Sequence, residues 1–455
     1  MGEMAPGSLT RSMATVAVSS SSQLAADAGA RIAGLGGNAV DAAIAAVLVA
    51  MVTELGIIAP GASGFITIST PDADPVVIDA YAEMPGRGLP HDRFGGGGRR
   101  VWLGYGGGME TIVGWGSVAT PGAFAGLHQA HSRNGFLPWE RLLAPAIAID
   151  ERGFPLSVPS GLYLAFSHEL VYGWDAESSA IVHRDGRPLA AGDHVFIPYL
   201  GATFSRLALI PGDLYTGALA RSAAAAAEAG GGILTDADLA EYHPVSRDPI
   251  TVPLGDWTVA TNPAPAVGGA TMAALVLLMT GDALSAWDAE TLRRYADVQG
   301  AVLRYRRERL DPYGERAAAA RDLLETARRG RPDELLSSPS TVHTSAVDSE
   351  GTAIALTLSA GYGSGAMIPG TGFWMNNSLG EIELAAEGYH ALPPGTRLIS
   401  NMAPTIATRD DGAVLALGSP GADRITTAVA SVLLNHLHLG MPLQEAVDHP
   451  RMHVE

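Results

Sequence analysis

The residues best suited to chemistry lie near position 341, where a hydroxyl side chain stands between a loop and a strand. Thr341-Val342-His343-Thr344-Ser345-Ala346-Val347 follows a loop-like Ser-Ser-Pro-Ser and precedes Asp-Ser-Glu-Gly, which is a strand-and-turn pattern. A threonine that starts a strand is usually only a β-branched structural residue. If the peptide bond before it is cut, however, its new α-amine can act as the base for its own hydroxyl. The sequence therefore makes Thr341 a candidate nucleophile.

Composition limits the partners and the classes of site. The chain has 455 residues, of which 47% are hydrophobic and 17% charged, so a large core is expected and wholesale disorder is excluded. A net charge of -18 disfavours nucleic acid and anionic membrane surfaces as partners. The absence of cysteine excludes disulfides, thiolate metal sites and cysteine nucleophiles.

Two N-terminal segments bear on location. Residues 1–22 lack the basic and apolar regions of a secretory signal, and the near-apolar stretch 39–52 is too short to span a membrane. We therefore expect a cytoplasmic protein that acts on a small molecule, without a membrane partner.

The elements that must position these groups alternate between strand and helix signals. Helices are predicted at 23–36, 40–53 (capped by Asn38), 121–134, 138–153, 218–230, 284–305 and 426–439. Strands are predicted at 16–18, 65–69, 76–81, 344–347, 353–359, 405–408 and 413–417. Strands flanked by helices predict an α/β (α+β) fold, a four-layer α/β/β/α sandwich. The glycine-rich 95–108 is expected to be an exposed loop, and the arginine-rich 318–340 a mobile linker.

Several segments, in order, resemble the γ-glutamyltranspeptidase family of N-terminal-nucleophile (Ntn) hydrolases over nearly the whole chain. Any single segment would be weak, but their order is hard to obtain by chance. The main ones are Gly36-Gly37-Asn38-Ala39-Val40-Asp41, Pro121-Gly122-Ala123-Phe124, Gly231-Gly232-Ile233-Leu234-Thr235, Thr341-Val342-His343, Gly370-Thr371-Gly372, Asn376-Asn377, Ser400-Asn401-Met402-Ala403-Pro404-Thr405 and Gly418-Ser419-Pro420-Gly421-Ala422.

The resemblance implies that a precursor cuts itself between Ser340 and Thr341. The products are a large subunit, residues 1–340, and a small subunit, residues 341–455, which begins with the nucleophile. Ser359 matches a hydroxyl residue that supports the nucleophile, and the backbone N–H groups around Gly421 and Ala422 match the oxyanion hole. No cofactor is implied. Both a heterodimer and a homodimer of processed heterodimers are compatible with the sequence.

The segments expected to recognise the substrate depart from the family pattern. The stretch Tyr81-Ala82-Glu83-Met84-Pro85 lacks the arginine that clamps the α-carboxylate of a glutamyl group, and neither Tyr81 nor Ala82 can replace that bidentate contact. Ordinary glutathione hydrolysis is therefore not expected. The residues still placed at the substrate are Asn377, Ser378, Glu381, Ser400, Asn401, His343 and Glu83, with Glu381 a candidate for holding an ammonium group.

Three functions accommodate this pattern. The first is an autoprocessed hydrolase or acyl transferase for a non-glutamyl substrate. The second is a carbon–carbon bond hydrolase of the kind implicated in actinobacterial alkylproline antibiotic pathways, which the alanine- and arginine-rich composition suits. The third is a catalytically silent binding homologue.

Plainer structural roles are also open for several of these residues. Glu83 suits a structural ion pair, and His343 suits packing or hydrogen bonding. His128, His131, His436 and His438 do not form a metal set, so no metal is expected. The run Gly95-Gly96-Gly97-Gly98 precedes arginines rather than Lys-Ser/Thr, which excludes a phosphate-binding P-loop.

Overall fold

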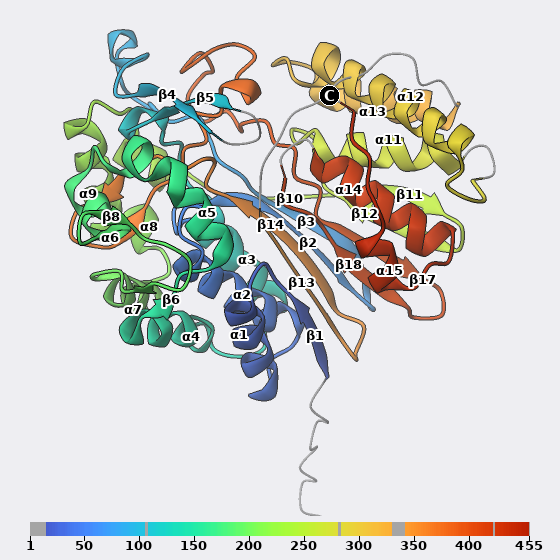
Figure 1. Ribbon diagram of the computed structural model, residues 1–455, viewed down its shortest axis with the longest axis horizontal. Coiled ribbons are helices and arrows are strands. Elements are labelled where there is room, and N and C mark those ends of the chain that lie inside the picture. Colours follow the sequence, from blue (N-terminus) through green and yellow to red (C-terminus); the bar gives the residue numbers. More distant parts are fainter. Residues whose placement is uncertain (1–14, 105–107, 281–283, 330–341, 422–423, 455) are drawn as a thin grey trace, which may run out of the picture.

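The computed structural model describes residues 15–104, 108–280, 284–329, 342–421 and 424–454 (Figure 1). The predicted scission residues Ser340 and Thr341, and Ala422 of the predicted oxyanion hole, lie outside these ranges. The described residues still include both strands that follow the nucleophile in sequence and most of the predicted substrate contacts.

A six-stranded antiparallel sheet forms the centre of the molecule. Its strand β14 is buried along its whole length, because Ala, Ile and Leu side chains cover both of its faces. In spatial order the sheet contains β1 (Val16–Ser19), β13 (Val342–Asp348), β14 (Ala353–Ser359), β2 (Ser63–Thr70), β3 (Ala73–Ala80) and β10 (Val245–Arg247).

A second antiparallel sheet has four strands and contacts the first. Small side chains make the contact: Ala353 and Ala355 of β14 pack with Ile406 of the second sheet, beside Val414 and Ala416. Elements β13, β14 and β2 all approach this sheet. Its strands, in order, are β11 (Ile250–Leu254), β12 (Trp257–Thr261), β17 (Thr405–Arg409) and β18 (Val414–Leu417).

Each of the two sheets is covered by its own group of helices (Figure 1). Helix α2 (Ala39–Thr53) is buried on every face and packs on β1, β13 and β14; Asn38 and Asp41 form a capping box at its start. The helices α1 (Gln23–Gly34), α3 (Ala123–Asn134) and α4 (Trp139–Arg152) join it. Beside the second sheet lie α11 (Gly268–Thr280), α12 (Ala289–Tyr305), α13 (Arg316–Arg328) and α14 (Arg424–Leu433).

The remaining described elements are shorter and lie mostly in the connections. They are 3-10 helices η1 (His91–Arg93), η2 (Trp115–Ser117) and η5 (Ile382–Leu384); π-helices η3 (His168–Tyr172), η4 (Arg306–Leu310) and η6 (Leu434–His438); helices α5 (Val158–Ser167), α6 (Ala176–Val182), α7 (Leu200–Leu209), α8 (Asp213–Thr216), α9 (Ala218–Ala229), α10 (Asp236–Ala240) and α15 (Leu443–Asp448); and strands β4 (Arg99–Leu103), β5 (Met109–Val113), β6 (Phe154–Pro155), β7 (His183–Arg184), β8 (Arg187–Pro188), β9 (His194–Val195), β15 (Met367–Ile368) and β16 (Phe373–Trp374).

Each predicted strand and helix is found, and its ends move by a few residues at most sites. Two expectations were wrong. The segment 95–108 contains strand β4, which pairs with β5, so it is not a plain loop. Residues 318–328 belong to α13 rather than to a linker, because Ala319, Leu323 and Ala327 recur at helical spacing and are buried. The rest of that segment, from 330 on, lies outside the described residues.

No helix in the described ranges is both long and apolar enough to cross a bilayer.

Candidate active site

The ends of β13 and β14 bring the predicted nucleophilic end of the small subunit next to Ser359. Val342, which follows Thr341 in sequence, is the first residue of β13 and pairs with Leu358 of β14. Ser359, the next residue of β14, is buried, and its hydroxyl accepts a hydrogen bond of 2.9 Å from the Gly361 N–H. The structure therefore places Ser359 at the strand end that neighbours the start of β13.

Gly421 lies at the beginning of the turn into α14. Its φ of +116° is a conformation that glycine adopts without strain, and its carbonyl accepts from the Arg424 N–H at 3.1 Å. Gly418 lies directly against the ring of His343. Gly418, three residues before Gly421, is thus the residue of this segment that contacts β13, and the predicted partner Ala422 lies outside the described residues.

His343 is held by hydroxyl groups on both sides of its ring. Nδ1 lies 2.8 Å from Thr357 Oγ1, and Nε2 lies 2.6 Å from Ser345 Oγ. Burial lowers the pKa of His343 to about 3, so the imidazole is neutral at physiological pH. Both nitrogens are used within the protein, which supports the hydrogen-bonding role and not the predicted substrate contact.

Tyr81 lies directly after β3, within the stretch that lacks the expected arginine. Its ring is buried and stacks on Phe65 with a centroid distance of 5.4 Å. Burial and, to a smaller extent, the nearby carboxyl of Glu381 raise the pKa of Tyr81, and the nearby side chain of Ser400 acts against this rise. The fold therefore brings together Tyr81, Ser400 and Glu381, three residues distant in the sequence.

Among Tyr81, Ser400 and Glu381, the Glu381 carboxyl has the most unusual environment. Burial and the neighbouring carboxyl of Glu383 raise its pKa well above the ordinary value. The second carboxylate accepts a hydrogen bond of 2.6 Å from the Tyr362 hydroxyl. No ion pair joins Glu381 to a cation of the described residues. A buried carboxyl with these neighbours is suited to binding a donor or a cation supplied from outside.

Ser400 and Asn401 lie where the chain passes the N-terminus of α11. The Ser400 carbonyl accepts from the N–H groups of Val267 and Gly268, at 2.9 and 3.2 Å. A Cβ at Gly268 would come within 2.0 Å of the Asn401 carbonyl oxygen, so glycine is required there. The buried pair is thereby fixed against α11.

The two neighbouring asparagines act within the protein. Asn376 accepts from Ala119 N–H and donates to Gly61 and Ala119 carbonyls. Asn377 accepts from Tyr362 N–H at 2.9 Å and donates to the Ile112 carbonyl. Since both ends of the Asn377 amide are engaged, it positions the turn after β14, and the predicted substrate contact through this amide is not available in this arrangement.

Ser378 lines a small, open cleft. Apolar side chains from Met84, Leu379, Leu398 and Ile399 form much of its wall, and the polar residues Arg316, Glu387 and His390 also border it. Ser378 is the predicted substrate residue that borders this cleft, which extends to Arg316 at the start of α13.

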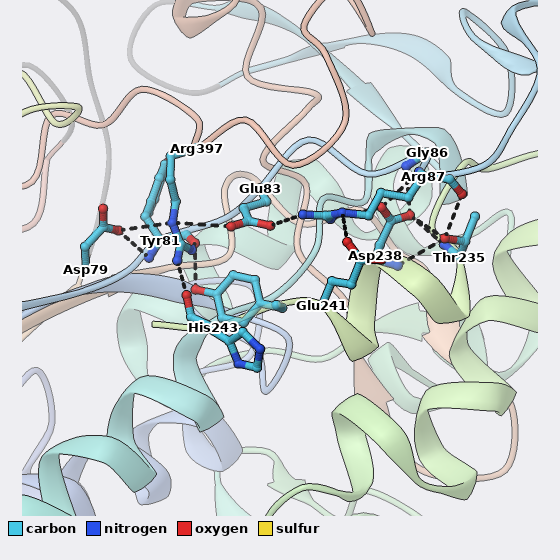
Figure 2. A network of polar contacts seen from close by, with 11 residues as sticks. Asp79, Tyr81, Glu83, Gly86, Arg87, Thr235, Asp238, Glu241, His243 and Arg397 are labelled. Carbon is cyan, nitrogen blue, oxygen red and sulfur yellow. Dashed lines mark hydrogen bonds and ion pairs between the residues drawn. The ribbon is translucent and has the colours of Figure 1, made fainter. Parts of the chain in front are cut away.

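Glu83 belongs to a chain of alternating charges and not to the substrate wall (Figure 2). Its carboxylate lies 3.2 Å from Arg87 Nη2 and 3.6 Å from Arg397 Nε. Arg397 also lies 3.8 Å from Asp79, and Arg87 lies 3.3 Å from Asp238. The predicted substrate contact of Glu83 is therefore corrected to a structural ion pair, because two guanidinium groups already take its charge.

Arg397 was missed from the sequence, although it organises this region. It donates to the carbonyls of Tyr81 and His243, and its guanidinium lies 4.6 Å from the centre of the Tyr242 ring. Tyr242 in turn donates to the Tyr81 carbonyl at 2.8 Å. The available signal was weak: Arg397 directly precedes the apolar pair Leu398-Ile399, and a buried cation needs partners.

Comparisons with known proteins identify the family of this chain. Residues 25–455 match the family described as Gamma-glutamyltranspeptidase. The glutathione hydrolase proenzyme of Pseudomonas aeruginosa is 30% identical over 96% of this chain and 82% of its own. The acylase ACY 1 proenzyme of a Pseudomonas species is 28% identical over 95% and 81%.

Similarity in structure extends over the same length. The crystal structure of cephalosporin acylase from Bacillus halodurans has a TM-score of 0.78 and 25% sequence identity, and covers 99% of this chain and 86% of that one. The relatives are hydrolases and acylases, several of them named as proenzymes. The chain belongs to the γ-glutamyltranspeptidase family of Ntn hydrolases.

Proposed function

We propose that this enzyme cuts itself between Ser340 and Thr341 and then uses Thr341 to hydrolyse or transfer acyl groups that lack the α-carboxylate of a glutamyl unit. The observation that carries the substrate proposal is that Tyr81, buried near Ser400 and Glu381, stands in the stretch where the carboxylate-binding arginine is missing. These three residues, called the substrate wall below, supply two hydroxyls and a carboxyl group. The guanidinium of Arg397 is turned to backbone carbonyls and to Tyr242.

The proposed chemistry begins with attack of Thr341 Oγ on the substrate carbonyl carbon, while the freed α-amine takes the hydroxyl proton. Backbone N–H groups around Gly421 and Ala422 would stabilise the oxyanion. The α-ammonium then returns the proton to the leaving amine as the carbon–nitrogen bond breaks. Water or an amine attacks the resulting ester and releases the acyl group. Ser359, at the neighbouring strand end, would position the nucleophile.

Each of the two main sheets contains strands from both predicted fragments. In the central sheet, β13 and β14 of residues 341–455 lie between β1 and β2 of residues 1–340. In the second sheet, β11 and β12 come from the large fragment, and β17 and β18 from the small one. The fragments would therefore remain associated after scission, held by ladder hydrogen bonds. The contacts between the two sheets, with helices packed on each, support the four-layer α/β/β/α sandwich.

Processing is tested by intact mass and N-terminal sequencing of the purified protein. We expect two fragments, the smaller beginning at Thr341, which co-elute until denaturant is added. Thr341→Ala should remain one chain and be inactive, while Thr341→Ser should process, since it keeps the hydroxyl. Wild-type protein that stays uncut on long incubation would favour the silent binding homologue.

Substrate choice is tested with three matched anilides. γ-Glutamyl anilide carries both ammonium and carboxylate, 4-aminobutyryl anilide keeps only the ammonium, and glutaryl anilide keeps only the carboxylate. We expect kcat/KM for the 4-aminobutyryl compound to equal or exceed that for the γ-glutamyl one, and glutaryl anilide to be the poorest. A strong preference for γ-glutamyl anilide would contradict the proposal. Activated ketones in the same panel test carbon–carbon bond hydrolysis, which would use the same Thr341 attack.

A further inference from the structure

A cluster of two histidines and a glutamate lies outside the active site, where α5 passes into the π-helix η3 and α6 ends. His168 begins η3, Glu169 follows it, and His183 directly follows α6. One ligand atom from each of the three residues lies within 4.8 Å of the others. The histidine rings are partly buried and the glutamate is exposed. We propose that this cluster is a binding site for a divalent first-row transition-metal ion, with zinc as the representative ligand.

The hydrogen bonds fix which nitrogen of His183 is available. His183 Nδ1 lies 2.9 Å from the Ser179 carbonyl, which only accepts, so this nitrogen carries the proton. Its Nε2 lone pair then faces His168 Nδ1, at 2.8 Å. An imidazole whose second nitrogen donates to a backbone carbonyl is the arrangement typical of histidine metal ligands.

The spacing of the ligand atoms is close to what a metal requires. Zinc–nitrogen bonds of about 2.0–2.1 Å at a tetrahedral angle place two nitrogens about 3.3 Å apart, so the rings need to separate by about 0.5 Å. The direct bond between the rings forms when one imidazole carries the proton that a metal would replace. His168 Nδ1, His183 Nε2 and a Glu169 carboxylate oxygen supply three ligands, and water completes four-coordination.

The electrostatics of the cluster also suit a cation. The Glu169 carboxylate adds a negative charge beside the two imidazoles, which partly balances the charge of a divalent ion. The sequence does not single out this cluster, because the histidines that it groups are His128, His131, His436 and His438. Within the described ranges, their rings turn to other partners, including the Leu137 and Met441 carbonyls.

A metal here would join two elements that hold the turn after β14. Ser178 of α6 donates to the Gly365 carbonyl at 2.8 Å, and a Cβ at Gly365 would lie within 1.8 Å of the Val171 carbonyl of η3. Binding should therefore raise the thermal stability of this side of the protein without supplying a group to the reaction.

The test uses chelator-treated, full-length protein titrated with Zn²⁺ by calorimetry and with Co²⁺ by visible absorption, together with Tm. We expect one ion per chain, a rise in Tm with zinc, and Co²⁺ absorption of the intensity typical of four-coordination. His183→Ala should weaken binding at least about 100-fold, and the isosteric, exposed Glu169→Gln about 10-fold. His449→Ala, which alters a partly buried histidine elsewhere in the chain, should bind as the wild type does.

Several results would overturn the proposal. These are no zinc binding up to millimolar concentration, or equal binding by wild type and His183→Ala when both show the same Tm without metal. Unchanged binding by Glu169→Gln would remove the glutamate and refute the three-ligand site. Because metal content and Co²⁺ spectra are read directly, the outcome does not depend on the proposed acyl chemistry.

Discussion

Two groups of acidic residues near the substrate region differ in how their charges are balanced. Asp79, Glu83 and Asp238 alternate with Arg397 and Arg87, so each buried carboxylate faces a guanidinium (Figure 2). Glu381, by contrast, has Glu383 as its charged neighbour, and this raises its pKa. Paired buried charges hold a structure in place, whereas an uncompensated one is available to a ligand. The difference separates residues that organise the site from those expected to recognise a substrate.

The largest effect on the paired group of charges is expected from replacing Arg397. Arg397→Met removes one of the two cations that face Asp79 and one of the two that face Glu83, leaving Arg247 and Arg87. It also removes the contact with the Tyr242 ring, which lies 4.6 Å from the guanidinium. Breaking a buried ion pair costs about 3–5 kcal/mol, so we expect a large fall in Tm or loss of folded protein. The measurement is thermal unfolding of purified variants.

Arg409→Met is the matched control for this prediction. Arg409 also pairs with a carboxylate, Asp411, and lies over an aromatic ring, Trp257, at 4.8 Å, but it is solvent-exposed. Exposed pairs contribute little, so its Tm should stay near that of the wild type. Equal losses for the two variants would show that the buried network has no special structural weight.

Replacing Glu381 should lower activity without lowering stability, the reverse of what is expected for Arg397→Met. Glu381→Gln keeps the shape but can no longer ionise when a substrate ammonium binds, so kcat/KM for 4-aminobutyryl anilide should fall by about 10- to 100-fold, the worth of one hydrogen bond to a charged group. Stability should not fall with it. If the variant were instead less stable and fully active, Glu381 would be a structural residue like Glu83.

The same variant gives a pH dependence with a definite sign. A carboxyl whose pKa is raised in the folded state binds protons more readily when folded than when unfolded. Its contribution therefore weakens stability progressively as pH rises above the ordinary glutamate range. The Tm of Glu381→Gln relative to wild type should increase between about pH 4.5 and neutrality. A difference that is constant with pH would contradict the uncompensated charge.

A smaller effect is expected from restoring a cation at the substrate wall. Tyr81→Arg places a guanidinium near Ser400 and Glu381, where it can bind an α-carboxylate. The ratio of kcat/KM for γ-glutamyl over 4-aminobutyryl anilide should rise about 10-fold. Tyr81→Phe, which loses only the hydroxyl, should leave that ratio unchanged. An unaltered ratio in Tyr81→Arg would mean that the missing arginine does not set substrate choice.

The sequence predicts local elements far better than the balance of charges. The Asn38 cap, the hydrophobic α2 and the alternating strands follow from neighbouring residues, and the structure confirms them. The sequence favours a linker over helix α13 because arginines alternate with the alanine and leucine residues that form its buried face. Whether an acidic residue is paired depends on contacts between distant segments, as Arg397 with Asp79 shows, and no local pattern reports that.

The smallest effect on activity is expected at His343. This residue tests whether every titratable group without a counter-charge takes part in the reaction. Its ring is buried without a counter-charge, yet Thr357 and Ser345 hydroxyls satisfy both nitrogens. Because its folded pKa of about 3 lies below the ordinary 6.5, the native state resists protonation, and stability declines as pH falls from 6.5 towards 3. His343→Gln should lose that acid-side decline while kcat/KM at neutral pH changes less than about 3-fold, since the hydroxyl contacts can be kept. A pH–rate profile that shifts in the variant would place the imidazole in the reaction, and neutral hydrogen bonds would then not be enough to mark a buried titratable group as structural.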